Sequence, residues 1–202
     1  MNATLFRNVS ILDCTGAEPF IGSVLVEGNR IAAVVPGGAT LAAGDAMVVD
    51  GRGATLMPGL IEAHSHLSFT DVAQSVELGF ISPEEHMLKK ALHGRGVRVL
   101  IGGDYGFAWN PIGTNARDIG HFVDRLEFSP MDAIMAATRL GGQIMGMGDR
   151  LGQVRPGYLA DLLLVDGDPL ENVAILLRRD RLKAIMKDGA FWKSPASGFV
   201  GA

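Results

Sequence analysis

Short apolar segments, separated by turn residues, occupy the first quarter of the chain. Residues 4–11, 22–27, 30–35 and 47–50 are rich in valine, isoleucine and leucine, and two of these residue types favour strands strongly. The sequence EGNR at 27–30 joins two of the segments, and glycine and asparagine tolerate the positive φ of a hairpin turn. This pattern predicts an N-terminal region made of β-strands.

Helix-start signals appear in the middle of the chain. Serine-proline steps at 82–83 and 129–130 each place a capping hydroxyl before a proline that suits the first helical position. We predict a helix from the first step to about residue 92, and a helix from the second step that ends at the glycine pair 141–142. A further helix is predicted over residues 117–126.

Strand signals also lie between and after these helices. Residues 97–101, with the sequence VRVLI, have the composition of a buried strand. Further strands are predicted at 159–165, 181–187 and 190–193, and an Asp-Gly turn separates the last two. Strands therefore occupy both ends of the chain, with α/β units between them.

The simplest arrangement of these elements packs the two terminal β regions together. We predict a composite β-sandwich domain from residues 1–57 and 154–193, because neither region alone has enough strands for a core of its own. Residues 58–153 would form a separate α/β domain inserted into it, and residues 194–202 a loose tail.

The composition restricts the class of function. A hydrophobic content of 48% with 20% charged residues is typical of a soluble globular protein. The net charge of −4 gives no electrostatic attraction to nucleic acid or to an anionic membrane. The single cysteine cannot form an internal disulfide, and the N-terminus lacks the pattern of a signal peptide. We expect a cytoplasmic protein with no nucleic-acid or membrane partner.

Two histidines one residue apart follow the apolar segment that begins at Met57. In a strand, alternate side chains share a face, so His64 and His66 would point the same way while Ser65 points away. Two neutral imidazoles on one face form half of a site for a divalent metal such as zinc. A polar pair in a surface turn is the alternative, but the apolar segment before the pair favours the metal site.

Together these features resemble the amidohydrolase superfamily of metal-dependent hydrolases. The resemblance depends on the motifs MPGLIEAHSH at 57–66, GGD at 102–104, GQVRPGYLADL at 152–162 and DGDPL at 166–170. It implies a (β/α)₈ TIM barrel with a metal site inside its mouth, and a small β-sandwich built from both termini. Amidase-like and dipeptidase-like members are the most similar in pattern.

The resemblance also implies roles for individual residues. His64 and His66 match the metal ligands of the first barrel strand. Asp104 matches the aspartate that ends the last strand, which binds metal or handles the proton of the metal-bound water. The implied cofactor is a divalent metal, zinc by donor type, with one or two ions in an intact site. Tyr105 and Trp109 follow in a loop over the mouth, where they would contact substrate. The alternative is that Phe107 and Trp109 only pack the loop down.

The chain departs from the superfamily in length. A TIM barrel takes about 250 residues, and residues 58–153 provide roughly a third of that. The central lysine or glutamate and two further histidines of the superfamily have no match between His66 and Asp104. We expect His86, His93 and His121 to be solvated helix or loop residues. The sequence thus predicts a truncated barrel whose middle is missing.

Two hypotheses for function remain. The first is a metal-dependent amidohydrolase in shortened form, which hydrolyses a C–N bond of an amide, lactam or peptide-like small molecule and uses Asp104 to transfer the proton. The second is a non-catalytic remnant that acts only as a folding or oligomerisation module. Under either hypothesis, the open strand edges of a partial barrel predict a homo-oligomer.

Overall fold

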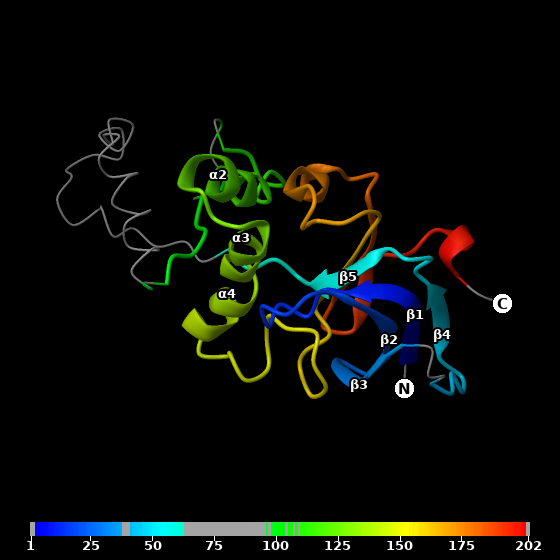
Figure 1. The fold of residues 1–202 in the computed structure, drawn as a ribbon. Coiled ribbons are helices and arrows are strands. Elements are labelled where there is room, and N and C mark those ends of the chain that lie inside the picture. The colour runs from blue at the N-terminus through cyan, green and yellow to red at the C-terminus, as the bar shows by residue number, and fades with distance from the viewer. Residues whose placement is uncertain are drawn as a thin grey trace.

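The computed structural model describes residues 3–37, 41–62, 96, 98–103, 105–106, 108 and 110–200 (Figure 1). The described strands are β1 (Ala3–Ile11), β2 (Phe20–Glu27), β3 (Arg30–Pro36), β4 (Met47–Asp50), β5 (Thr55–Pro58), β6 (Leu162–Val165), β7 (Leu182–Lys187) and β8 (Ala190–Lys193). The described helices are α2 (Arg117–Leu126), α3 (Pro130–Ala136) and α4 (Arg139–Ile144), with 3₁₀ turns η2 (Val173–Leu177) and η3 (Ser197–Phe199). The predicted mixed α/β class is confirmed.

Strands from both ends of the chain form one sheet. The order is β3-β2-β1-β5-β6-β7-β8, and β4 pairs with β1 beside this path. The two chain ends join where β5 and β6 pair antiparallel, with Leu56 opposite Leu164. The predicted two-sheet sandwich is not confirmed, because the ladders connect all the described strands into a single sheet.

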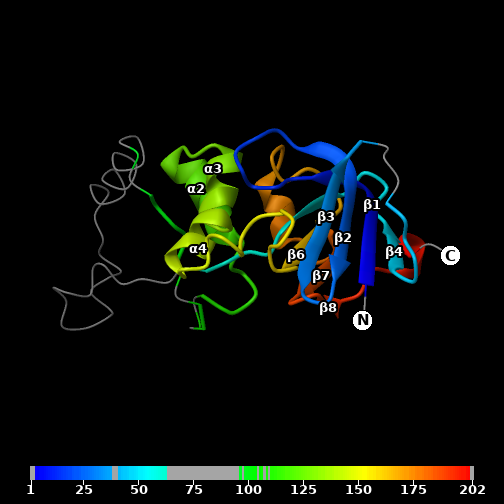
Figure 2. The same ribbon diagram turned by 90° about the horizontal axis from the view of Figure 1, so that it is seen from below.

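The middle strands of this sheet are buried on both faces. Every residue of β5 and β6 is buried, which explains why these segments are apolar without alternation. Leu56 and Leu164 point into a core shared with the N-terminal strands. Met57 and Leu163, which alternate with them, point into a second core shared with the helices. Figures 1 and 2 show the helices and the N-terminal strands at opposite sides of the molecule.

Two hairpin turns meet and hold the chain ends together. The turn between β2 and β3 contains Gly28 and Asn29, and the turn between β7 and β8 contains Asp188 and Gly189. The Asn29 side chain donates a hydrogen bond of 2.9 Å to the Asp188 carboxylate. A Cβ atom on Gly189 would collide with the Gly28 carbonyl oxygen, so only glycine allows the turns to approach this closely.

Helix α2 has the predicted bounds. Ile119, Phe122 and Leu126 are its buried residues, spaced by three and four positions, so one face of the helix packs on the core. Phe122 contacts Phe128 with ring centroids 4.8 Å apart. The buried face of α2 belongs to the same core as Met57 and Leu163 of the sheet.

The helix predicted from residue 129 starts as expected but breaks early. The Ser129 hydroxyl caps it by accepting a hydrogen bond of 3.1 Å from the Asp132 backbone N–H. The helix ends at Ala136, because the backbone leaves the helical region at Thr138, where φ is −132° and ψ is −87°. The Thr138 hydroxyl donates to the Ile134 carbonyl at 2.8 Å, an interaction that bends helices.

The glycine pair predicted to end this helix lies inside the next one. Gly141 and Gly142 are buried within α4. A Cβ atom on Gly141 would lie 2.7 Å from the Cβ of Ile61, and one on Gly142 would collide with the Leu151 carbonyl oxygen. These glycines therefore serve close packing, and their prediction as a helix stop was wrong.

The strand predicted at 97–101 is absent from the described residues 98–103. Ile101 is only 3% exposed, and Val99 is partly buried beside it in the core shared with the helices. Helix packing, rather than pairing with another strand, therefore buries these apolar side chains. Hydrophobic periodicity cannot distinguish the two cases in a short run. The truncated barrel consequently stays a prediction.

The C-terminal residues 194–200, expected to be loose, contact the sheet. Val200 forms an isolated bridge with Val49, and Phe199 packs against the core of the N-terminal strands. The guanidinium of Arg52 and the ammonium of Lys183 lie 5.7 and 5.9 Å from the centre of the Phe199 ring. No helix in the described ranges is long and apolar enough to cross a membrane.

Cys14 lies in the core shared with the helices and is fully buried. Burial raises the pKa of its thiol to about 12. At about pH 8 only roughly one thiol in ten thousand is then ionised, so we expect the folded chain not to react with a chromogenic disulfide reagent. After unfolding in guanidinium, one thiol per chain should react. Rapid reaction of the folded chain, absent from a Cys14→Ser control, would contradict this burial.

Candidate functional site

Of the predicted site residues, only Tyr105 lies in the part of the chain that the structure describes. His64, His66, Asp104 and Trp109 lie outside the described residues, and so do His86 and His93. Tyr105 is described, and so are the residues on either side of the predicted metal ligands. The site is therefore defined here by the segments that lead to these ligands.

Residues 59–62 lead from β5 to the histidine pair. They have no regular secondary structure, so the strand expected to carry the pair does not continue from β5 through them. The Gly59 N–H donates to the Asp161 carbonyl at 2.8 Å, and the Ile61 N–H donates to the Ala137 carbonyl at 2.6 Å. These bonds hold the segment between β6 and the α3–α4 junction.

A cleft of about 590 Å³ opens beside this segment. Its walls are mostly apolar and include Ile61, Ile101 and Leu163. Two of its polar residues are already paired, because the Asp161 carboxylate lies 2.7 Å from the ammonium of Lys187. An apolar cleft with a few polar groups is the usual form of a small-molecule site.

The backbone directly before Asp104 is held by Asn110. The Asn110 side-chain amide donates to the Gly103 carbonyl, and the Asn110 carbonyl accepts a hydrogen bond of 2.9 Å from the Gly106 N–H. The Asn110 side-chain oxygen in turn accepts from the guanidinium of Arg117, the first residue of α2. Sequence reasoning missed Asn110 and Arg117, because neither belongs to a recognised motif and only the folded loop brings them together.

Tyr105, predicted to contact substrate, is engaged with the protein itself. Its hydroxyl donates to the Asn115 carbonyl at 3.2 Å. Burial, and then the nearby Asp118 carboxylate, raise the pKa of Tyr105 well above its ordinary value, so the phenol stays protonated. Substrate binding by Tyr105 stays a prediction, and Phe107 and Trp109, the residues of the packing alternative, lie outside the described residues.

Within the described ranges, no three histidine, cysteine or carboxylate side chains gather as a metal site. His121 lies on α2 and lines a small cavity of about 300 Å³ with Asp118 and Arg125. The donor set of the predicted ligands, two imidazoles and one carboxylate, fits zinc, which takes three protein ligands in a catalytic site and leaves one position open.

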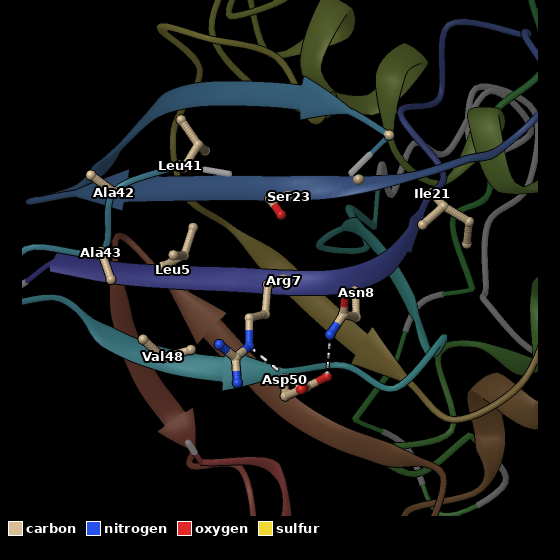
Figure 3. Close-up of a pocket in the computed structure, with 12 residues that line it drawn as sticks. Leu5, Arg7, Asn8, Ile21, Ser23, Leu41, Ala42, Ala43, Val48 and Asp50 are labelled. Carbon is tan, nitrogen blue, oxygen red and sulfur yellow. Dashed lines mark hydrogen bonds and ion pairs between the residues drawn. The ribbon is translucent and has the colours of Figure 1, made fainter. Parts of the chain in front are cut away.

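A second cleft, of about 600 Å³, lies over β1, β2 and β4 (Figure 3). Its charged groups bind one another: Arg7 Nε lies 3.4 Å from the Asp50 carboxylate, and the Asn8 side chain donates to the same carboxylate at 3.1 Å. The Asn8 hydrogen bond lowers the pKa of Asp50 below its usual value. These contacts hold β4 to β1, so we assign the candidate site to the cleft beside residues 59–62.

Comparisons with known proteins match both the sequence and the fold. A family model described as the amidohydrolase family matches residues 74–191. The 5′-deoxyadenosine deaminase of Methanothermobacter thermautotrophicus is 49% identical over 67 residues, which are 33% of this chain and 14% of that protein. The ochratoxinase of Aspergillus niger is 31% identical over 104 residues, 51% of this chain and 21% of that protein. The chain thus spans only a small part of these relatives.

Among solved structures, an enamidase described as a member of the amidohydrolase superfamily superposes with a TM-score of 0.72. The superposition covers 99% of this chain and 100% of that chain at 13% identity, so it is evidence for the fold alone. The family model is evidence from sequence, and it matches more than half of the 202 residues. The chain therefore belongs to the amidohydrolase family.

Proposed function

We propose that this chain is a shortened metal-dependent amidohydrolase that hydrolyses a carbon–nitrogen bond in a small amide-, lactam- or peptide-like molecule. The family match over residues 74–191 carries the proposal. The matched range includes Asp104, and His64 and His66 lie shortly before the start of that range at residue 74. Relatives named as a deaminase and an enamidase support the choice of bond.

Two of the proposed site residues only hold the metal, whereas Asp104 both holds the metal and transfers the proton. His64, His66 and Asp104 hold a divalent metal, zinc by donor type, which when bound supplies Lewis-acid activation of water and of the scissile carbonyl. Asp104 accepts the proton of the attacking water and delivers it to the leaving nitrogen. The balance is that of a hydrolysis: the C–N bond breaks, a C–O bond forms, and the amine leaves protonated.

The cleft beside residues 59–62 suggests which substrates fit. Its walls carry Ile61, Ile101 and Leu163, so we expect substrates with an apolar acyl or side-chain group to be preferred over charged ones. A partner of this kind is a small molecule, in keeping with the expectation from sequence.

The proposal predicts effects on metal content and on kcat, which are measured separately. His64→Ala should lose bound metal, measured as metal per chain by elemental analysis. Asp104→Asn should lower kcat by about 100- to 10,000-fold on whichever N-acyl amino acid, dipeptide or lactam the wild-type chain cleaves. His121→Ala is the matched control, because His121 lies on α2 outside the proposed ligand set, and it should leave metal content and kcat unchanged.

A folded wild-type chain that binds no metal and cleaves none of these substrates would overturn the proposal. It would favour the second hypothesis, a folding or oligomerisation module. One observation supports that alternative: the described residues of the core between the N- and C-terminal strands come from residues 6–56 and 154–199. Light scattering would then test the predicted homo-oligomer.

A further inference from the structure

We propose that Asn110 is a positioning residue for Asp104, which it orients through the Gly103 carbonyl. The inference rests on the proposed role of Asp104 in proton transfer. The Gly103 carbonyl belongs to the peptide group that joins residue 103 to Asp104, so a bond to this carbonyl restrains the described backbone that leads to Asp104. The Asn110 side-chain amide donates that bond.

The hydrogen bond to the Gly103 carbonyl restrains a backbone segment that two consecutive glycines would otherwise leave flexible. Gly102 and Gly103 form a glycine pair, which leaves the backbone with more conformational freedom than any other two residues would. Asn110 restricts the segment twice, at the Gly103 carbonyl and at the Gly106 N–H. Because Asn110 is only 9% exposed, water competes poorly for these bonds.

The absence of a side chain at residue 103 is part of the same arrangement. A Cβ atom on Gly103 would lie 2.5 Å from the Tyr105 ring and would collide with the Asp118 carboxylate. The backbone of residue 103 therefore lies directly against the Tyr105 and Asp118 side chains, which would have to move aside for a residue with a Cβ atom. In the same arrangement the carbonyl of residue 103 accepts the hydrogen bond from Asn110.

Arg117 determines which way round the Asn110 amide lies. A guanidinium can only donate hydrogen bonds, so the group it contacts must be the Asn110 oxygen, and the amide nitrogen must then face the Gly103 carbonyl. Arg117 is the first residue of α2, whose buried face is fixed in the core by Ile119 and Phe122. The core thus holds Gly103 through α2, Arg117 and Asn110.

Two substitutions at residue 110 separate donation from acceptance. Asn110→Asp can still accept from Arg117 but cannot donate to the Gly103 carbonyl, and Asn110→Ala can do neither. Both variants should lower kcat by about 10- to 100-fold with KM within about 3-fold, since misplacing a reacting group slows the chemical step more than it weakens binding. The matched control is Asn172→Ala, whose side chain accepts from the Ala174 N–H at the start of η2. It should change kcat less than 2-fold.

A pair of substitutions at residue 117 adds a rescue. Arg117→Met removes the donor to Asn110 and should lower kcat by about 10-fold, whereas Arg117→Lys keeps a donor and should recover most of the wild-type kcat. If Arg117 has only a structural role, Arg117→Met and Arg117→Lys should lose thermal stability and kcat to the same extent. That result would overturn the inference.

A measurement that does not depend on activity tests the contact itself. The ¹³C resonance of the Gly103 carbonyl should shift in Asn110→Asp and Asn110→Ala, and it should not shift in Asn172→Ala. An unshifted resonance, or a wild-type kcat in Asn110→Asp, overturns the positioning role. An inactive wild-type chain whose Gly103 resonance does shift overturns the proposed function instead, and leaves Asn110 as a residue that only holds the loop.

Discussion

Replacing Gly152 by alanine is expected to lower the free energy of unfolding by about 3 kcal/mol or more. Gly152 has a φ of +88°, which costs a residue with a side chain about 1 kcal/mol. A Cβ atom there would also collide with the Thr138 carbonyl oxygen and lie 3.0 Å from the Cα of Arg139. These atoms are backbone at the α3–α4 junction and cannot rotate away, so the junction itself would have to move.

The chain provides a matched control for this experiment. Gly157 has a φ of +87° and no atom within 4 Å of the Cβ position. Gly157→Ala should therefore cost only the conformational part, about 1 kcal/mol. Urea unfolding of both variants measures the difference. Equal losses would mean that the turn at Gly152 does not approach the α3–α4 junction this closely.

Replacing Phe6 by alanine should lower the free energy of unfolding by about 3–5 kcal/mol, the usual range for a buried aromatic ring. Phe6 is only 1% exposed and lies in the core between the N- and C-terminal strands. Its ring packs edge-on against Phe191 of β8, with centroids 6.1 Å apart. The substitution therefore removes a contact between the two ends of the chain as well as apolar burial.

Two comparisons isolate that contact in urea unfolding. Ile21→Ala, at a residue that is 56% exposed on the neighbouring strand β2, should change stability by no more than about 0.5 kcal/mol. The double variant with Phe191→Ala should give a coupling of about 0.5–1.5 kcal/mol. A coupling of zero would contradict the packing of β1 on β8.

Elements set by local chemistry could be predicted from the sequence. The EGNR turn and the Asp-Gly turn at 188–189 placed their hairpins, and the three- and four-residue spacing of Ile119, Phe122 and Leu126 placed α2. In each case the residues that determine the element lie within the element or next to it. No knowledge of tertiary packing was needed.

Elements that depend on distant neighbours could not be predicted in this way. The apolar run 98–101 resembles a strand until the helices that bury it are known. Gly141 resembles a helix stop until Ile61 is found against it. Glycines and short apolar runs have more than one structural use, and only the fold decides between them.

The candidate site likewise contains residues that a sequence motif identifies and residues that only the folded chain brings together. His64, His66 and Asp104 were found because a motif carries them, and their roles stay predictions together with zinc, the cytoplasmic location and the homo-oligomer. The tie from Arg117 through Asn110 to Gly103 has no sequence signal, because it depends on how the loop folds back on α2.

The pairing of β5 with β6 has a consequence for how amidohydrolases of this kind can vary. The chain leaves the sheet at Pro58 and re-enters it at Leu162, and these two residues are register partners. Exit and entry are therefore neighbours, whatever lies between them. The entropic free-energy cost of closing a loop rises by only about 0.6 kcal/mol for each doubling of its length. Connections of very different length between Pro58 and Leu162 would therefore be tolerated. Segments of different length between β5 and β6 are thus exchangeable during evolution while the same sheet holds both ends.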